Sequence, residues 1–84
     1  MNRYLVIAMR LPQFDTDQIR PHREFLDALR EQGRLELAGG FSDKSGGAYL
    51  LRAADLDEAR ALALADPLHL TGSSRLDVYE WQAA

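Results

Sequence analysis

PHREFLDALREQG, residues 21–33, is the stretch that decides the fold of this 84-residue chain. Gly33 follows its last turn, and a glycine in the left-handed conformation ends many helices. Apolar and aromatic side chains recur at i, i+3, i+4 and i+7, the period of an amphipathic helix. These positions are His22, Phe25, Leu26 and Leu29. The pattern therefore predicts a helix and places a histidine on the face that packs against the protein.

Strand patterns lie on both sides of this helix. Residues 3–9 are apolar on both alternating faces, so we expect both faces of this strand to be covered. A cluster of turn residues over 42–47 joins two later strands into a hairpin. The paired glycines Gly39 and Gly40 indicate a bulge or a close approach by another group. The expected elements are strands over residues 3–9, 35–41, 48–53 and 75–81, and helices over 21–33 and 56–66.

The order of these elements, βαββαβ, is that of an α+β ferredoxin-like domain spanning residues 1–84. Right-handed crossovers put both helices on one face of the antiparallel sheet. The other face then stays open, although the first strand is apolar there and Tyr79 and Trp81 oppose Leu76 and Val78. An exposed apolar sheet face is typical of an interface. We therefore predict a homodimer in which two copies pack sheet against sheet.

The second expected helix ends at Asp66, which precedes Pro67 and lies seven residues after Ala59 on the apolar stripe. In the predicted topology the start of the first helix and the end of the second lie at the same end of the sheet. His22 and Asp66 should therefore meet. A carboxylate can orient an imidazole for proton transfer. Alternatively, the buried Asp66 carboxylate needs a hydrogen-bond partner and His22 supplies it for structural reasons alone. The residue types leave both interpretations open.

Charged and polar residues around the helices suggest ordinary helix-end and surface interactions. Thr16 or Asp17 is expected to cap the first helix. Asp55 with Glu58 resembles a capping box for the second helix. The first helix also carries two oppositely charged i, i+4 pairs on its outer face. These are Arg20–Glu24 and Arg23–Asp27.

Composition excludes several classes of function. With thirteen acidic and ten basic residues, a net charge of −3 and no cysteines, the chain lacks a basic nucleic-acid surface, a disulfide framework and a thiolate. No segment is long and apolar enough to span a membrane, and no signal-peptide pattern begins the chain, so we expect a cytoplasmic protein. His22, His69 and Asp66 lack compact metal-ligand spacing. We expect neither a metal nor a cofactor.

Several short motifs lie along the whole chain, namely His22, Gly33, Ala38 to Gly40, Gly46, Asp57 to Ala59, Asp66–Pro67 and Gly72. In this order and spacing they resemble the YCII-related family. The resemblance implies a dimeric α+β barrel in which His22 and Asp66 are the pair proposed as the family's active site. Relatives include a dehydrochlorinase that acts on a chlorinated hydroxyquinol, and muconolactone isomerase shares the wider fold. Gly39–Gly40 departs from the family, which usually has Gly-Pro there.

Two functions of different classes fit these residues. The first is an isomerase or lyase that moves protons on a small cyclic or aromatic oxygenated molecule, with His22 as general acid/base and Asp66 as its orienter. The second is a non-catalytic homodimer that binds a small molecule or regulates a partner, with a structural His–Asp pair. Aromatic side chains and polar loop residues would bind the ligand. These candidates are Phe25, Phe41, Tyr49, Tyr79, Ser45, Ser73 and His69.

Overall fold

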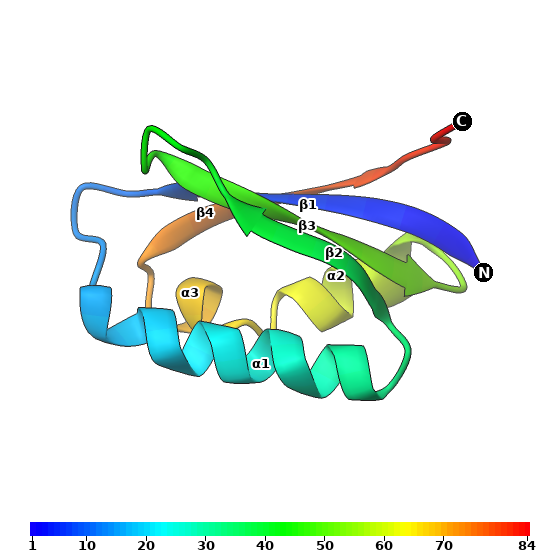
Figure 1. Cartoon of the computed structure of the whole chain (residues 1–84), viewed down its shortest axis with the longest axis horizontal. Helices are drawn as coiled ribbons and strands as arrows, with labels where there is room; N and C mark the ends of the chain where they lie inside the picture. The colour runs from blue at the N-terminus through cyan, green and yellow to red at the C-terminus, as the bar shows by residue number, and fades with distance from the viewer.

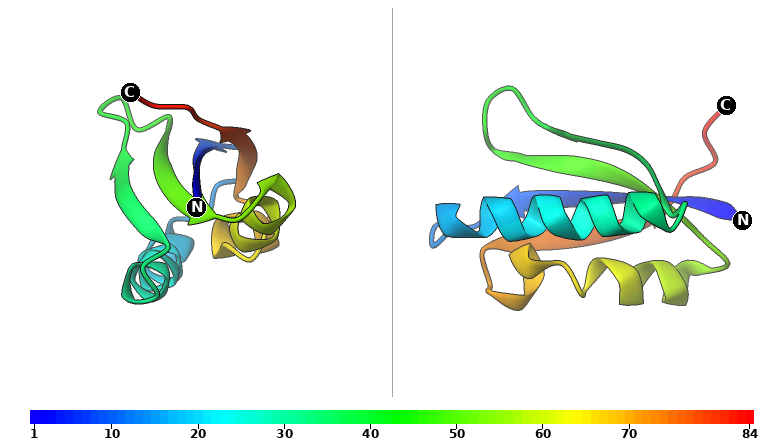
Figure 2. Two further views of the ribbon diagram at one scale, coloured as in Figure 1. Left: turned by 90° about the vertical axis from the view of Figure 1, so that its right-hand side faces the viewer. Right: turned by 60° about the horizontal axis from the view of Figure 1, so that its bottom comes forward.

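A computed structural model describes residues 1–84 and shows a four-stranded antiparallel sheet with all its helices on one face (Figure 1). The strand order is β2-β3-β1-β4, which confirms the α+β ferredoxin-like arrangement. Figure 2 shows α1 beneath the β2–β3 side of the sheet and α2 with α3 beneath the β4 side. The elements are β1 (Asn2–Arg10), the 3₁₀ turn η1 (Thr16–Gln18), α1 (Ile19–Glu31), β2 (Leu35–Gly40), β3 (Gly46–Ala53), α2 (Leu56–Ala63), α3 (Pro67–Leu70) and β4 (Ser74–Glu80).

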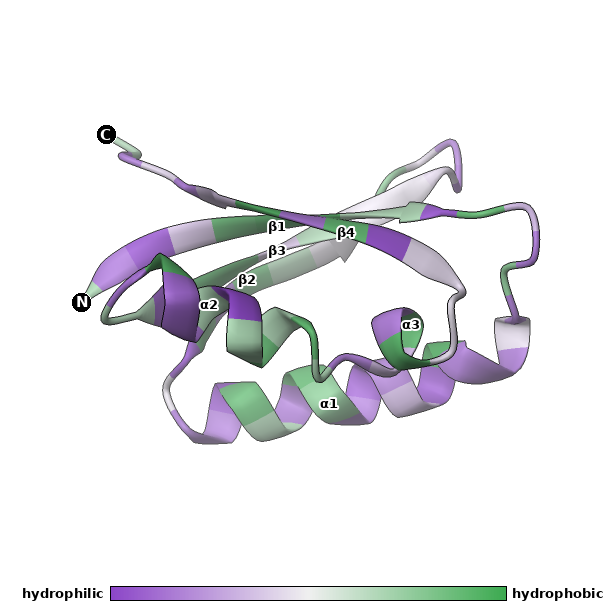
Figure 3. Ribbon diagram, turned by 180° about the vertical axis from the view of Figure 1, so that it is seen from behind, coloured by the Kyte–Doolittle hydropathy of each residue, from purple (hydrophilic) through white to green (hydrophobic).

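Alternation along β1 decides which side chains form the core. Tyr4, Val6 and Ala8 are buried on the face that the helices cover. In the register Val6 lies opposite both Tyr49 of β3 and Val78 of β4, so three strands contribute to one layer. Leucines and alanines of the helices pack against this layer, and Figure 3 shows hydrophobic and hydrophilic residues alternating along α1. The predicted helix stripe is therefore the inner face of α1.

The opposite face of the sheet has no helix over it. Leu37 is 68% exposed, and Tyr79 and Trp81 are each about half exposed. Leu5 and Ile7 of the central strand are half-buried on the same face. The two layers seen in Figure 2 therefore leave an apolar sheet surface in contact with solvent, as the sequence predicts. No helix of the structure combines the length and hydrophobicity needed to cross a membrane.

The start of the first helix differs from the expected one. Asp15, and not Thr16 or Asp17, is the capping residue, because its side chain accepts a hydrogen bond from the Asp17 N–H at 2.9 Å and begins the turn η1. This turn leads into α1 two residues before Pro21. Gly33 has a φ of 72°, which confirms the predicted left-handed helix end.

One predicted ion pair on α1 is also wrong. Arg20 and Glu24 pair as expected at 3.2 Å. Asp27, however, pairs with Arg30 at 3.0 Å and not with Arg23. Residues three apart on a helix are neighbours just as residues four apart are, so sequence spacing alone did not distinguish the two arginines. Arg23 keeps its charge without a carboxylate partner from this helix.

The second helix ends earlier than its apolar spacing predicts. α2 stops at Ala63, and the predicted loop after Pro67 contains the additional short helix α3. Asp66 has an extended backbone with a ψ of 130°, which the following proline favours. Its side chain then caps α3, with Pro67 in the first turn. Asp66 is thus the N-cap residue of α3 and does not belong to the apolar stripe of α2.

The glycines of the hairpin distinguish between the two alternatives predicted for Gly39 and Gly40, a bulge and a close approach. The β2–β3 ladder is regular at Gly39 and Gly40, and its irregularity lies between Leu35 and Leu37. A close backbone approach is present, because a Cβ added at Gly47 would lie 2.6 Å from the carbonyl oxygen of Gly39. The approach is also tight at Gly46, where an added Cβ would overlap the carbonyl oxygen of Ala8 on β1. Such an approach between backbones leaves room only for glycine.

We predict that Gly46→Ala destabilises the protein while Gly40→Ala, at the other side of the same hairpin, does not. A Cβ at residue 46 must displace β1, and overpacking of this kind costs about 1–3 kcal/mol. At Gly40 the nearest atom to an added Cβ is 3.8 Å away, which is an ordinary contact. Urea unfolding of the two variants tests this difference. Equal stabilities would contradict the close approach.

Candidate active site

His22 and Asp66 meet at one end of the sheet, between the first turns of α1 and the start of α3. The Nδ1 atom of His22 lies 2.9 Å from Oδ1 of Asp66. Asp66 is fully buried, whereas the His22 side chain is 19% exposed. The carboxylate therefore lies behind the imidazole, and the imidazole separates it from solvent.

The Asp66 carboxylate accepts hydrogen bonds from three separate elements. Besides His22 of α1, the hydroxyl of Tyr49 on β3 donates to Oδ2 at 3.0 Å and the backbone N–H of Leu68 donates to Oδ1 at 2.9 Å. A carboxylate that faces Nδ1 assigns the proton of a neutral imidazole to that nitrogen. The Nε2 atom of His22 then carries the lone pair, and it has no hydrogen-bond partner within the chain.

Tyr49 is held as a neutral donor. Burial, the charge of Asp66 and the hydrogen bond to it together raise the pKa of the Tyr49 phenol far above its ordinary value of 10.0. Its ring packs against His22, with centroids 6.0 Å apart, and edge-on against Phe25 at 6.4 Å. The imidazole is thus held on one side by the phenol ring and at Nδ1 by the carboxylate.

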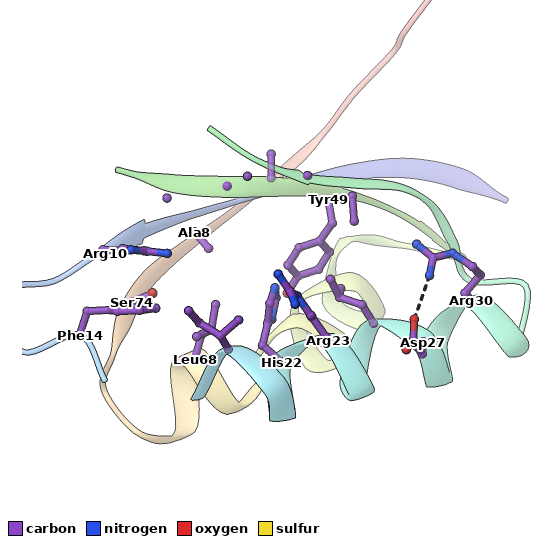
Figure 4. A pocket seen from close by; sticks show the side chains of 18 residues that line it. Ala8, Arg10, Phe14, His22, Arg23, Asp27, Arg30, Tyr49, Leu68 and Ser74 are labelled. Carbon is purple, nitrogen blue, oxygen red and sulfur yellow. Dashed lines mark hydrogen bonds and ion pairs between the residues drawn. The ribbon is translucent and has the colours of Figure 1, made fainter. Parts of the chain in front are cut away.

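A cavity of about 430 Å³ lies beside His22, between α1 and the β2–β3 hairpin. Small-molecule sites have volumes of roughly 300–1,000 Å³. Figure 4 shows His22 rising from α1 and Tyr49 descending from the sheet to meet in its middle. The sheet wall is nearly free of side chains because it is formed by glycines and alanines, including Gly39, Gly40 and Gly47. The pair therefore borders a hollow site and not a filled core.

Residues 3–82 match the YCII-related domain. The chain belongs to this family. The uncharacterized protein YjpA of Bacillus subtilis (strain 168) is 44% identical over 82 residues, which cover 98% of this chain and 96% of YjpA. Among solved structures, the fold is similar to 5-chloro-2-hydroxyhydroquinone dehydrochlorinase (TftG) from Burkholderia phenoliruptrix AC1100 in complex with 2,5-dihydroxybenzoquinone. That similarity has a TM-score of 0.79 and 19% identity, and it covers 98% of this chain and 95% of TftG.

Of the ligand-binding residues predicted for this YCII-related protein, only Tyr49 lines the cavity with His22. Phe25 packs behind Tyr49. Tyr79 lies opposite Leu5 in the register and so faces the open side of the sheet, because strand side chains alternate. Tyr79 therefore does not line this cavity.

The predicted loop residues also lie outside the cavity. The hydroxyl of Ser45 bonds to Asp43 within the hairpin turn, and Phe41 extends from that turn with 40% exposure. His69 is exposed on α3, a helix that the sequence did not predict. Ser73 is buried, and its hydroxyl lies 2.7 Å from that of Thr71. These residues share the end of the sheet with the pair but do not line its cavity.

The sequence prediction missed several residues that do line the cavity. Arg10 follows Tyr4, Val6 and Ala8 at the strand period of two, so extending the inner face of β1 by one residue would have identified it. Ser74 lies opposite Arg10 in the register. The remaining missed side chains come from α1 and the loop before it, and no group of three or more potential metal-binding side chains occurs among them. They are Phe14, Ile19, Arg23, Leu26, Asp27 and Arg30.

We predict that Tyr49→Phe lowers the free energy of unfolding at pH 7 by about 1–3 kcal/mol, because Oδ2 of Asp66 loses its donor. The variant should also change the response to alkali. Above pH 10 the unfolded chain releases the Tyr49 proton and the folded chain keeps it, so stability falls as pH rises. Removing that proton should reduce the fall by about 1.4 kcal/mol per pH unit. Urea unfolding between pH 7 and 11 measures both effects, and parallel pH profiles would contradict the assignment.

Proposed function

We propose that this protein is a cofactor-free enzyme that transfers protons on a small cyclic or aromatic oxygenated molecule, as an isomerase or a lyase of the dehydrochlorinase type. The observation that carries the proposal is the unpartnered Nε2 of His22 at a ligand-sized cavity, with Nδ1 held by buried Asp66. An imidazole in this tautomer can accept a proton at neutral pH and return it as the imidazolium. A purely structural histidine would not need to border a cavity.

The proposed roles follow from the hydrogen bonds. Nε2 of His22 removes a proton from a ring carbon or hydroxyl, and the buried Asp66 carboxylate stabilises the resulting imidazolium through Nδ1. The Tyr49 hydroxyl remains a donor to Asp66 and limits rotation of the carboxylate. In an isomerisation the proton returns to another ring atom. In an elimination the electron pair forms a double bond as a leaving group such as chloride departs.

TftG supports the substrate class by analogy. It is a dehydrochlorinase with the same fold, and its structure contains a six-membered oxygenated ring, 2,5-dihydroxybenzoquinone. At 19% identity the similarity extends to the fold and not to the reaction. The cavity of about 430 Å³ nevertheless has room for such a ring against the glycine wall. Hydroxyquinols, lactones and their halogenated analogues are therefore the compounds to test first.

We predict that His22→Gln abolishes turnover of a substrate found in that screen while it preserves the fold. Glutamine can still bond to Asp66 but cannot exchange a proton near neutral pH, and general acid/base catalysis is worth about 10²–10⁴-fold. The matched control is His69→Gln, which changes the only other histidine, on the exposed surface of α3. Rates and melting temperatures of both variants should be measured. Full activity of His22→Gln would rule out the proposed base.

The same screen tests the non-catalytic alternative. Asp66 also caps α3, so the pair has a structural role whether or not it performs chemistry. A compound that binds beside His22, as seen by NMR, and stays unchanged over hours would favour a binding module. Conversion of such a compound, with loss of conversion in His22→Gln, would favour the enzyme.

We further propose that the protein forms a homodimer through the open face of the sheet. Leu37 and the aromatic residues Tyr79 and Trp81 form an apolar surface there, with Leu5 and Ile7 at its centre. A twofold axis would place this surface against the same surface of a second copy, so that the two apolar faces cover each other. The resemblance of the sequence to a dimeric α+β barrel points to the same partner.

Light scattering at micromolar concentration should give twice the 9.4 kDa of one chain. Leu37→Asp should convert the protein to a monomer, because it places an unpaired charge on the apolar surface that the second copy would cover. Leu70→Asp is the matched control, since Leu70 is exposed to a similar extent (69% against 68%) but lies on α3 in the helix layer. A folded wild-type monomer, or equal effects of the two variants, would contradict the proposed dimer.

A further inference from the structure

One end of the cavity holds a buried hydroxyl without a partner. Ser74 is only 4% exposed, and its Oγ atom forms no hydrogen bond within the chain. It is the only buried side-chain oxygen or nitrogen in the structure of which this is true. Ser74 lines the cavity, and an unpaired buried polar group at a cavity wall calls for an explanation. A hydrogen-bonding group of a bound molecule would supply the missing partner.

A positive charge lies directly across from this hydroxyl. Arg10 of β1 pairs with Ser74 of β4 in the register, so their side chains are neighbours on the inner face of the sheet. The Arg10 guanidinium lies over the Phe14 ring, 4.2 Å from its centroid, and no carboxylate of the chain pairs with it. Figure 4 shows Arg10 and Ser74 together at one end of the cavity, with His22 between them and Arg30.

The cavity is positive although the protein is acidic. Its charged lining consists of three arginines and one aspartate, whereas the whole chain has a net charge of −3. Asp27 is already paired with Arg30, so Arg10 and Arg23 keep their charges free. Arg23 adjoins His22 on α1. Like charges gathered at a concave site attract a molecule of the opposite charge.

We propose that the cavity binds a cyclic organic acid, with its carboxylate at Arg10 and Ser74 and its ring against the glycine wall beside His22. A guanidinium fork and one hydroxyl on adjacent strands suit the two coplanar oxygens of a carboxylate. The bare backbone at Gly39 and Gly40 provides a flat surface for a ring, since no side chain projects there. This inference rests on the proposed function only in placing the reacting ring carbon at Nε2 of His22.

Binding of matched probes tests the inference without turnover. 2,5-Dihydroxybenzoate and benzoate are compared with their neutral carboxamides by NMR titration of the dimer or monomer as purified, and inorganic phosphate serves as the free anion. Each carboxylate should bind about tenfold or more tightly than its amide, and should shift the backbone amides of Arg10 and Ser74. Phosphate at the same concentration should not displace a bound carboxylate.

Three variants locate the charge effect. Arg10→Gln should remove the preference for carboxylates and leave amide binding unchanged, and Ser74→Ala should reduce that preference several-fold. Arg75→Gln is the matched control, because Arg75 is next to Ser74 in the sequence but its side chain is 72% exposed and lies outside the cavity. This variant should leave both carboxylate and amide binding unchanged. Equal affinity for acids and amides across the probe set would overturn the inference, as would tight binding of phosphate or equal effects of Arg10→Gln and Arg75→Gln.

The outcomes separate this inference from the proposed function. If carboxylates bind with the predicted preference but no compound is converted, the acid subsite stands and the enzyme assignment fails. If neutral rings are converted through His22 and carboxylates have no advantage, the enzyme assignment stands and the acid subsite is wrong.

Discussion

The buried Asp66 carboxylate is the constraint on which the site depends. A fully buried charge is stable only when donors surround it, and here three donors reach it from α1, β3 and α3. Each of these contacts fixes a different part of the molecule. His22 holds α1 against the sheet, Tyr49 ties the sheet to the carboxylate, and the N–H of Leu68 begins α3. The same group that orients the imidazole therefore also joins the layers of the fold at this end.

Much of the fold could be predicted because strand and helix periods leave distinct patterns. β1 is apolar on both faces, α1 has a clear stripe, and the order of elements then permits few topologies. The meeting of His22 and Asp66 follows from chain direction alone. The predicted position of Asp66 on the apolar stripe of the second helix, however, was wrong. Asp66 lies beyond α2 as the cap of α3, and either position brings its carboxylate to the same end of the sheet. Periodicity did not distinguish them.

The lining of the cavity was harder to predict, because it depends on register and on individual ion pairs. Tyr79 and Ser74 both belong to β4, but side chains alternate along a strand, so Ser74 faces the helices and Tyr79 faces the open side. The choice of Arg30 over Arg23 as the partner of Asp27 decides which charge faces the cavity unpaired. The choice of arginine does not change the hydrophobic pattern of the chain, and a single sequence therefore gives no signal for it. The alternation of Tyr79 with Leu76 and Val78, in contrast, already places Tyr79 on the open face.

The double role of Asp66 has a consequence for comparing members of the family. A member of the family without any catalytic activity would still need this carboxylate, because the cap of α3 and the hydroxyl of Tyr49 depend on it. Selection for folding alone can thus preserve the aspartate. The imidazole is easier to replace, since any side chain of similar size that donates to Asp66, such as glutamine, would serve the fold equally well. Across relatives, a retained aspartate beside a histidine replaced in this way would mark members in which the proposed proton transfer cannot occur.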